Sequence, residues 1–458
     1  MSLKEKNKRI NQVKLTPEQG LRAPVKPFSF RSVDLFSTTE GFLCEPDRYR
    51  YLATSRSRKI IPRGSGLSYV AAGHGNGVVS FSMKHFTRIL DLNVNKRTVT
   101  VETGITIGEL QNVLFSHCLM LPVLPGHPQI SVGGCIACNV HGKNSFKNKN
   151  FCDWVEEITL LMPDGKTISL KRKDRGFSLT CGGFGLTGLI ISAKIKLQKL
   201  PLQTMEKKVF PVEDLVDTQK QMKVLSGQWD YLLSWNDLST SRSSGRGYIL
   251  AGRFSKQDSQ VASNCKYLGL NPSRKKIRLP WINEFSIPFI TKLYSLNLKF
   301  TGNGDCHFWE YVFPQAHMGF YFDMYGQKGF LEHQVLVPHE KWREYISRFR
   351  VLQKKFSVPI IITSLKLFSG RKSFLNFSGN GIGFTINIVN NKKSLAFLNK
   401  VDELDCKMQS MANIVKDSRL RSSVVKKQYP AYHNFKKEIR SWSSDNIYES
   451  VLSRRLAI

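Results

Sequence analysis

The sequence predicts a two-domain α+β protein, and three observations support this fold class. The chain has 458 residues of which 41% are hydrophobic, enough for two sizeable cores and too apolar for a disordered chain. Residues 55–200 alternate short strand patterns with glycine turns and a few helices. Residues 201–414 are richer in aromatic side chains and mix helices with strands. We therefore expect one domain over residues 1–200 and a second over 201–414.

The elements of the first region follow from strand periodicity and turn residues. Alternating apolar residues predict strands at 77–83, 89–92, 98–102, 155–162, 167–170 and 189–197. Thr106 and Glu109 form a capping-box pattern that opens a helix through His117, with Leu110, Val113 and Leu114 on one apolar stripe. Four of these strands pair as two hairpins, 89–92 with 98–102 and 155–162 with 167–170.

The second region contains strand patterns at 333–337 and 382–388, separated by helical stretches. The Ser/Arg/Gly-rich run 241–247 is a surface loop, and 271–276 is a basic turn. The tail, 429–458, carries aromatic residues and is expected to pack against the protein.

The formal charge of +33 is spread along the whole chain rather than gathered in one segment. Three interpretations remain open: nucleic-acid binding, attraction to an anionic membrane or a phosphorylated lipid, and the general composition of a proteome. No RNP aromatic set, zinc-finger spacing or basic heptad region accompanies the charge. This favours a phosphorylated lipid or a membrane face over a nucleic acid.

Cysteines and the N-terminal segment indicate the compartment. Nine cysteines without small-scaffold spacing predict reduced thiols. Cys135 and Cys138, followed by His141, resemble part of a zinc site, but no second ligand pair exists, so no metal is expected. Met1 to Lys14 lacks the apolar core of a secretory signal, which predicts a cytoplasmic protein. The charge adds an expected peripheral contact with the inner face of the membrane.

Glycine-rich loops dominate the first region, at 63–69, 73–77, 125–134 and 181–188. Glycine lets successive backbone N–H groups approach a pyrophosphate and adopt positive φ. Each loop alone is better explained as a hairpin turn, but four in one domain favour a dinucleotide site. Neither the G-x-G-x-x-G nor the Walker pattern is present.

The order of these motifs resembles the FAD domain of the vanillyl-alcohol oxidase superfamily. The run from Val123 to Asn144 is most similar to the decaprenylphosphoryl-β-D-ribose oxidase family, the flavin half of a two-enzyme epimerase. Shorter similarities follow at 330–338, 365–370, 415–419 and 453–456. The resemblance implies an FAD-binding domain over 1–200 completed by 415–458, and a substrate-binding cap domain with an antiparallel sheet over 201–414.

The resemblance also implies which residues hold FAD. They are Arg63, Gly64, Ser65, Gly66, Leu67, Ser68, Tyr69, Pro125, Gly126, His127, Gln129, Ser131, Gly133, Gly134, Cys138, Asn139, His141, Gly142, Gly183, Gly185, Thr187, Gly188 and Lys416. Covalent relatives place a flavin-linked histidine at the position of Leu67. Leucine forms no such bond, so the FAD is expected to be dissociable, with His127 an ordinary loop residue rather than a second attachment point.

Flavin-dependent alcohol oxidation needs a hydride acceptor, a base for the hydroxyl proton and positive charge near the flavin. The resemblance implies Lys416 as the flavin-facing cation and His141 as a neutral group beside the flavin. The alternatives are a solvated lysine and a histidine that only bonds backbone. Lys143, Gln334, Lys366 and Thr385 are the expected substrate-binding residues.

Two positions depart from the mycobacterial members of the family. Thr385 stands where those enzymes carry a cysteine, and Gly383 replaces a polar neighbour. Threonine still forms a hydrogen bond, but a thiol-directed covalent inhibitor has nothing to attack. These changes affect the substrate side, whereas the flavin loops keep their pattern.

The resemblance implies oxidation of the C2′ hydroxyl of a polyprenyl-phosphate pentose to a keto-sugar, in cell-envelope polysaccharide biosynthesis. An NAD(P)H-dependent reductase is the expected partner that completes the epimerisation. One alternative is an aldonolactone or free-sugar oxidase of the same fold. Another is a basic nucleic-acid-binding protein without enzymatic activity, whose binding would weaken steeply with salt.

Overall fold

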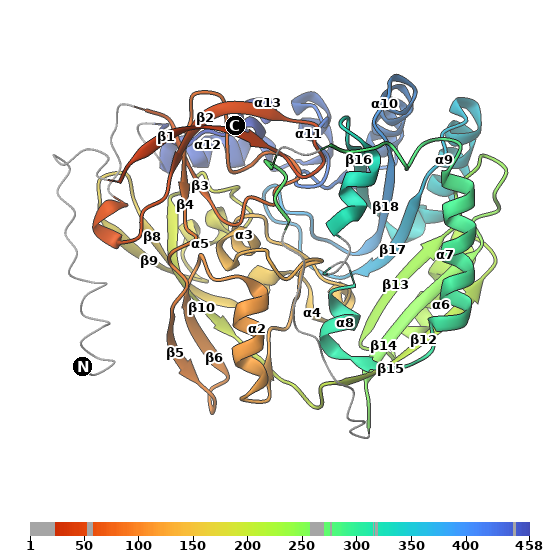
Figure 1. Cartoon of the computed structure of the whole chain (residues 1–458), viewed down its shortest axis with the longest axis horizontal. Coiled ribbons are helices and arrows are strands. Elements are labelled where there is room, and N and C mark those ends of the chain that lie inside the picture. The colour runs from red at the N-terminus through yellow and green to blue at the C-terminus, as the bar shows by residue number, and fades with distance from the viewer. Residues whose placement is uncertain are drawn as a thin grey trace.

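The computed structural model describes residues 23–52, 58–256, 270–274, 277–314, 316, 319–442 and 446–458. Met1 to Lys14, Cys265 and the end of the expected basic turn at 275–276 lie outside the described residues. Two α+β halves lie side by side, the first coloured red to yellow and the second mainly green to blue in Figure 1. The predicted fold class is confirmed.

The first half is built on two sheets. The smaller sheet has the order β1(Val25–Arg31), β2(Thr38–Cys44), β4(Val79–Ser82), β3(Ile60–Arg63). The larger sheet is antiparallel and has the order β5(Ile89–Asn93), β6(Thr98–Glu102), β10(Leu189–Lys196), β8(Val155–Leu161), β9(Thr167–Lys171). The predicted strands and both hairpins are therefore confirmed. The β1–β2 hairpin was not predicted from the sequence.

Helix α2 (Ile107–Phe115) begins where the capping box predicts it. Thr106 Oγ1 accepts a hydrogen bond from Glu109 N at 3.2 Å, and Glu109 Oε2 accepts one from Thr106 N at 2.9 Å. Leu110 and Leu114 are fully buried, but Val113 is 40% exposed. The expected apolar stripe is therefore wrong at Val113, because the buried face runs through Ile107, Leu110 and Leu114 instead.

Three short helices follow in the same half. They are α3 (Val132–Ala137), α4 (Ser145–Asn148) and α5 (Arg175–Thr180). The strand pair β7 (Leu119–Met120) and β11 (Gln198–Lys199) closes the connection to the second half.

The second half also has two sheets. One has the order β13(Tyr231–Asn236), β14(Gly247–Phe254), β12(Thr204–Val212), β15(Gly304–His307), and the other has the order β17(Ile362–Phe368), β18(Gly381–Val389), β16(Phe330–Val337), β19(Met411–Ala412). Leu365 N on β17 donates to Ser234 Oγ on β13 at 3.0 Å, which joins the two sheets edge to edge. The predicted strands at 333–337 and 382–388 are confirmed within β16 and β18.

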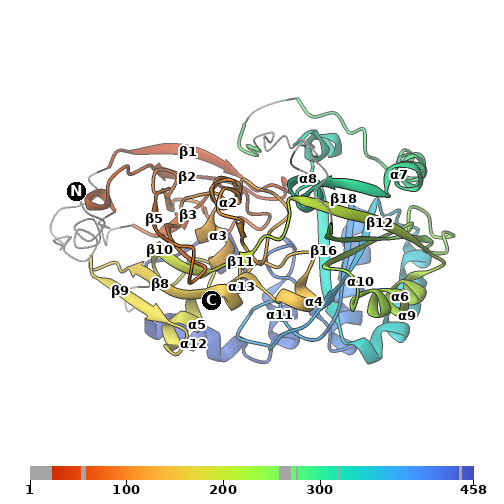
Figure 2. The same ribbon diagram turned by 90° about the horizontal axis from the view of Figure 1, so that it is seen from below.

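Helices α6 (Leu215–Leu225), α9 (Trp342–Phe356) and α10 (Lys392–Lys407) lie on one side of these sheets, and α7 (Ile287–Thr301) lies on the other (Figure 2). The short helix α8 (Phe308–Val312) packs with the first half. Side chains between the sheets and α6, α9 and α10 form a continuous apolar core. One face of β16 to β18 is therefore covered by helices. Among the described residues, no helix has the length and apolar character needed to cross a membrane.

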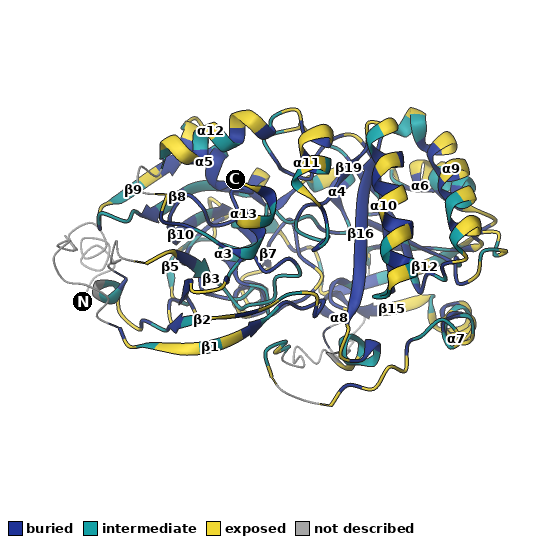
Figure 3. Ribbon diagram, turned by 90° about the horizontal axis from the view of Figure 1, so that it is seen from above, coloured by how far each residue is buried: buried dark blue, intermediate teal, exposed yellow. Residues whose placement is uncertain are grey.

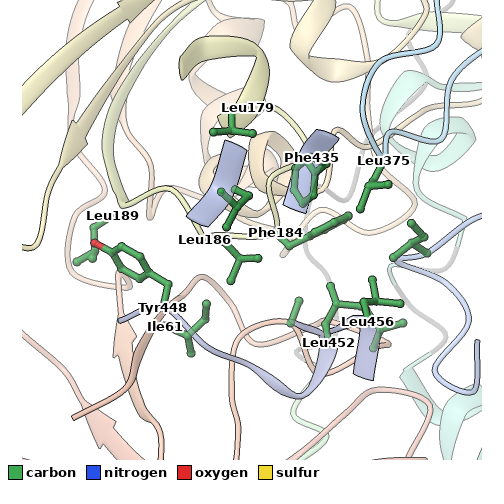
Figure 4. Packing of buried hydrophobic residues seen from close by; sticks show 14 of the residues in the cluster. Ile61, Leu179, Phe184, Leu186, Leu189, Leu375, Phe435, Tyr448, Leu452 and Leu456 are labelled. Atoms are coloured by element: carbon green, nitrogen blue, oxygen red, sulfur yellow. The ribbon is translucent and has the colours of Figure 1, made fainter. Parts of the chain in front are cut away.

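The C-terminal helices α11 (Ser422–Gln428), α12 (Tyr432–Trp442) and α13 (Val451–Leu456) return to the first half. Phe435, Leu452 and Leu456 pack with Ile61 and Phe184 in one buried cluster (Figure 4). The backbone before α13 also lies along β3, where Ile60 N donates to Ile447 O at 3.0 Å and Glu449 N donates to Ile60 O at 2.9 Å. The tail thus contributes to the core of the first half.

Candidate active site

The loop after β3, residues 63–69, lies against the loop that begins α3. A Cβ added to Gly64 would lie 2.1 Å from Ser131 Oγ, and one added to Gly66 would lie 2.1 Å from the Arg63 guanidinium. Gly66 also has φ of +74°, a conformation that favours glycine. Both glycines are therefore required by the close approach of neighbouring groups.

The backbone amides of this loop remain available to a ligand. The N–H groups of residues 64–67 donate no hydrogen bond to any described residue. The Arg63 guanidinium lies beside Gly66 and stacks on the Phe30 ring at 5.0 Å, and burial lowers its pKa to about 10. The arrangement presents successive donors, as an anion-binding backbone does.

The third glycine loop, 125–134, leads into α3. Ser131 caps this helix by accepting a hydrogen bond from Gly134 N at 3.2 Å, and Gly133 N donates to Thr103 O at 2.8 Å. Gly126 is exposed, whereas His127 is buried and burial lowers its pKa to about 4. Gln129 Oε1 accepts a hydrogen bond from Leu270 N at 2.7 Å. Thus the side chains of this loop hold its shape.

The remaining predicted flavin residues in this region hold the turn after α3. Cys138 ends the helix, with its N–H donating to Gly134 O. Asn139 has φ of +41° and its Oδ1 accepts a hydrogen bond from Cys152 N at 3.1 Å. Gly142 is buried, with a Cβ excluded by Asn144 Oδ1 at 2.8 Å.

The fourth glycine loop, 181–188, is buried in the core rather than presented at a surface. Gly185 has φ of +80° and lies against Pro62, and Gly188 lies against Leu161 O. A Cβ on Gly183 would lie 2.3 Å from Leu179 O, and Thr187 O accepts a hydrogen bond from Trp442 Nε1 at 2.9 Å. Packing alone explains these glycines, and their contact with a cofactor stays a prediction.

The face of β16 to β18 that the helices leave open is polar. Glu332 and Gln334 are two residues apart on β16 and therefore share this face. They pair with Asn387 and Thr385 on β18. Gln334 Nε2 donates to Thr385 Oγ1 at 2.9 Å, and Asn387 Nδ2 donates to Glu332 Oε2 at 3.3 Å. Lys366 joins them from β17. The sheet thus brings three of the four predicted substrate residues onto one face.

Lys416 lies between this polar face and the first half of the chain. Its Nζ is 3.1 Å from Glu332 Oε1 and 4.2 Å from the centroid of the Tyr69 ring. Ser418 Oγ donates to Tyr69 O at 2.8 Å. The predicted lysine therefore meets the end of the first glycine loop, far away in sequence. Its side chain is 30% exposed, so it is neither a solvated surface lysine nor a core residue.

His141 reaches the same face from the first half. Its Nε2 is 3.0 Å from Gln334 Oε1, which also accepts a hydrogen bond from Asn413 Nδ2 at 2.6 Å. Its Nδ1 is 3.3 Å from Gly142 O, so each ring nitrogen faces an oxygen that only accepts, and the neutral ring donates to one of the two. Burial, followed by the Lys366 charge, lowers the pKa of His141 to about 3. The imidazole is thus neutral throughout the physiological range.

Three lysines gather around this face. Lys143 Nζ donates to Tyr311 O at 2.6 Å; burial and then Lys366 lower its pKa to about 7. Burial and then Lys416 lower the pKa of Lys366 to about 8. Among the described groups that interact with these lysines on the sheet face, Glu332 is the carboxylate. The site therefore has excess positive charge, which suits an anionic ligand.

Sequence reasoning missed Glu332 and Asn413, which hold Lys416 and Gln334. The period-2 pattern of β16 was the signal that could have found Glu332, because residues two apart point to one side of a strand. Gly383 is also explained: a Cβ there would lie 2.3 Å from the Phe368 ring, which in turn packs against His141 with centroids 4.9 Å apart.

On the opposite face of β16, His333 anchors the segment that carries Lys416. Its Nδ1 is 2.9 Å from Asp417 Oδ2, and its Nε2 is 3.0 Å from Asp405 Oδ2. Arg419 forms a bidentate pair with Asp402 at 2.6 and 2.8 Å and reaches Asp417 at 2.9 Å. All five side chains are at most 7% exposed. This buried charge network fixes the backbone that directly follows Lys416.

Known proteins resemble the chain in its first half and along most of its length. A family model described as FAD binding domain matches residues 50–171. The chain is 26% identical over 425 residues to decaprenylphosphoryl-beta-D-ribose oxidase of Mycolicibacterium smegmatis, covering 89% of this chain and 91% of that protein. The chain thus contains an FAD binding domain and is similar to FAD-dependent oxidoreductases.

Two further relatives match about a third of the chain and about a quarter of their own length. Mitochondrial D-lactate dehydrogenase (cytochrome) of Kluyveromyces lactis is 32% identical over 139 residues, 30% of this chain and 23% of that protein. L-galactono-1,4-lactone dehydrogenase 2 of Oryza sativa is 31% identical over 147 residues, 32% of this chain and 25% of that protein. The enzyme class that they support is FAD-dependent oxidation at a CH–OH group.

The residues present fit FAD, the cofactor that the matched domain binds. The free amides of residues 64–67 supply donors for a diphosphate, and Gly64 and Gly66 keep the loop free of side chains that would cover them. Lys416, His141 and Tyr69 would offer bound FAD a cation, a neutral imidazole and an aromatic ring. When bound, FAD supplies the hydride acceptor.

Proposed function

We propose that this enzyme oxidises a secondary hydroxyl, C2′ of a polyprenyl-phosphate pentose, to the keto-sugar. The observation that carries the proposal is the polar face of β16 to β18, where Lys366 and Lys416 interact with one described carboxylate, Glu332, and the charge of Lys143 interacts with that of Lys366. This excess of positive charge matches a phosphate beside the oxidised sugar. The similarity to the Mycolicibacterium smegmatis ribose oxidase extends along 89% of the chain and supports the same substrate class.

The charged and the neutral side chains of the site have different proposed roles. Lys143 and Lys366 are placed to pair with the substrate phosphate, and Gln334 and Thr385 to bond sugar hydroxyls. Neutral His141 can accept the hydrogen bond of the reacting hydroxyl at its unprotonated ring nitrogen, which orients the C–H bond of the substrate. Lys416 is placed to stabilise negative charge on the oxygen of the reacting hydroxyl.

The product of this reaction is a keto-sugar, so a reductase that uses NAD(P)H is the proposed partner for completing an epimerisation. A phosphorylated lipid substrate also makes a peripheral membrane contact part of the proposal. Lys143, Lys366 and Lys416 form what we call the lysine cluster. An aldonolactone carries no phosphate charge for it to bind, so the cluster favours the phosphorylated sugar over that alternative. The FAD fit of the first glycine loop disfavours a protein that only binds nucleic acid.

Anaerobic titration tests the substrate. The purified enzyme is mixed with a short-chain prenyl-phosphoribose or with an aldonolactone, and the visible flavin absorbance is followed. We expect the phosphosugar to bleach the flavin. Bleaching by the lactone alone would refute the phosphosugar and establish the lactone alternative.

A matched pair of variants connects the result to the lysine cluster. Lys366→Gln removes one buried cation of the site, whereas Lys400→Gln removes an exposed lysine of α10 that pairs with Glu403. Lys366→Gln is expected to raise KM for the phosphosugar at least tenfold, since a charge-assisted contact contributes about 1.5–3 kcal/mol. Lys400→Gln should match the unmodified enzyme.

Acid precipitation tests non-covalent binding. Leu67 offers no atom for a covalent link to the flavin, so we propose that FAD is released into the supernatant. Yellow colour retained in the protein pellet would contradict this and would direct attention to His127 as the attachment point.

A further inference from the structure

Helix α7 and the segment before it expose more large apolar side chains than the rest of the described chain. Six of them define what we call the α7 surface: Trp281, Phe285, Phe289, Leu293, Leu296 and Phe300. Phe285 is 95% exposed and Phe300 is 77% exposed. Figure 3 shows α7 at the periphery of the molecule, with exposed residues along its outer side. Contiguous apolar patches of this kind mark an interaction site.

Helical spacing places the exposed residues on one stripe. Phe289, Leu293, Leu296 and Phe300 follow one another at intervals of four, three and four residues. The inward side of the helix is already occupied, because Ile287, Thr291 and Leu298 are buried. The outer stripe is therefore additional to the face that holds α7 on the protein.

The charge beside the stripe is positive. Lys292 and Lys299 are exposed and lie three residues after Phe289 and Leu296, along one edge of the stripe. The helix contains no acidic residue, and the preceding Glu284 pairs with Lys393 at 2.6 Å. Apolar side chains edged by lysines are typical of helices that lie in the interface of an anionic bilayer. The chain as a whole carries +33.

The α7 surface is continuous with the candidate active site. Ile282 and Ile287 are buried against Tyr325 and Phe330 at the start of β16. The Tyr69 ring packs on Phe330 with centroids 5.7 Å apart, and it also contacts the lysine cluster, because Lys416 Nζ lies 4.2 Å from its centroid. A short series of packed side chains thus connects α7 with the lysine cluster.

We propose that the α7 surface docks the enzyme on an anionic lipid bilayer, which places the site beside the headgroup layer where a lipid-linked substrate presents its phosphate. The reason for docking rests on the proposed function, because it assumes a lipid-linked substrate. Binding to vesicles can be measured without that assumption. The helix has 15 residues, fewer than the roughly 20 needed to cross a bilayer, so it would lie in the interface with its phenylalanines in the acyl boundary.

Co-sedimentation with vesicles tests the proposal. The flavin-loaded enzyme is mixed with vesicles of phosphatidylcholine alone or with phosphatidylglycerol added. We expect tight binding to the anionic vesicles and at least tenfold weaker binding after Phe289→Ser combined with Phe300→Ser. Lys292→Gln combined with Lys299→Gln should weaken binding to the anionic vesicles about fivefold for each lysine.

Val224 and Val351 supply the matched control. They are 71% and 65% exposed on α6 and α9, on the other side of the sheets, so Val224→Ser combined with Val351→Ser should leave vesicle binding unchanged. Visible flavin absorbance checks that each variant is folded. Failure of the unmodified enzyme to bind anionic vesicles, or equal loss in the control, would overturn the proposal.

A second copy of the chain is the competing occupant of the α7 surface. Size-exclusion chromatography with light scattering would reveal such a dimer. In that case the unmodified enzyme would form a dimer that the Phe289 and Phe300 substitutions dissociate, and it would fail to bind vesicles. That result would assign the α7 surface to a second copy of the chain and refute membrane docking.

Catalysis in solution is measured separately from docking. Bleaching by a soluble short-chain phosphosugar should be unaffected by the Phe289 and Phe300 substitutions, since neither residue belongs to the lysine cluster. Vesicle binding without bleaching would support the docking surface while refuting the proposed function.

Discussion

The buried charge network behind Lys416 gives the sharpest test of how the site is held. His333 and Arg419 are the cations, and Asp402, Asp405 and Asp417 are the carboxylates, so the network carries a net charge of −1 when all are ionised. The two carboxylates at its ring nitrogens raise the pKa of His333 to about 10, against the opposing effect of burial. At neutral pH the imidazole is therefore protonated.

Replacing His333 by glutamine removes this charge from a fully buried position. The network then has one cation against three carboxylates, and glutamine donates to only one of the two former partners. Removing one partner of a buried pair costs about 3–5 kcal/mol. Because glutamine keeps one hydrogen bond, we expect His333→Gln to lower the free energy of unfolding by about 3 kcal/mol at neutral pH.

The pH dependence gives a second signature. A folded-state pKa of about 10, above the ordinary 6.5, means that the stabilisation by His333 is complete below pH 6.5 and is lost as the pH rises through 10. The difference in stability between the two proteins should therefore shrink as the pH is raised from 7 toward 10. Turnover should also fall in the variant, because Asp417 adjoins Lys416.

Urea unfolding followed by tryptophan and flavin fluorescence measures these quantities. Glu344→Gln is the control, since its pair with Arg348 is exposed at 56% and 58% and should contribute less than about 0.5 kcal/mol. A loss below about 1 kcal/mol in His333→Gln, or a difference that grows with pH, would contradict the protonated network.

Three further predictions concern the site itself. Lys416→Ala should retain FAD but lower kcat about 10²–10³-fold, measured by stopped-flow reduction of the flavin; unchanged turnover would remove this lysine from the chemistry. Gly66→Val should abolish FAD retention on a desalting column, because its φ of +74° and the neighbouring guanidinium exclude a side chain; a yellow variant would contradict this. KM for the phosphosugar should rise as the pH increases through 7 to 8, where Lys143 and then Lys366 lose their protons, while an uncharged substrate analogue should show no such rise.

Local patterns in the sequence were sufficient for much of the fold. Alternation of apolar residues predicted the strands of the larger sheet in the first half, and the Thr106–Glu109 pattern predicted the start of α2. These signals depend on residues a few positions apart, which is why they could be found without a structure. The glycine loops and their order likewise indicated a dinucleotide-binding domain, and the family comparison confirms FAD.

Tertiary packing decided which of those signals concern the ligand. The glycines of 63–69 leave amides available, whereas those of 181–188 are buried against Pro62 and Trp442, although the two loops look alike in sequence. Val113 fits the apolar period of α2 but is exposed, because the neighbouring elements pack on the opposite side of the helix.

The protonation of the site lysines and the exposure of α7 could not be predicted from the sequence either. Nothing near Lys143 in the chain predicts a pKa of about 7, since the cause is burial together with Lys366 on a distant strand. The meeting of Lys416 with Tyr69 and Glu332, and the exposed outer stripe of α7, depend on how the two halves fold. Through short-range patterns, the sequence predicted the strands of the larger sheet in the first half, the start of α2 and a dinucleotide site. The structure alone decided protonation, charge balance and exposure, because these depend on neighbours that are remote in the chain.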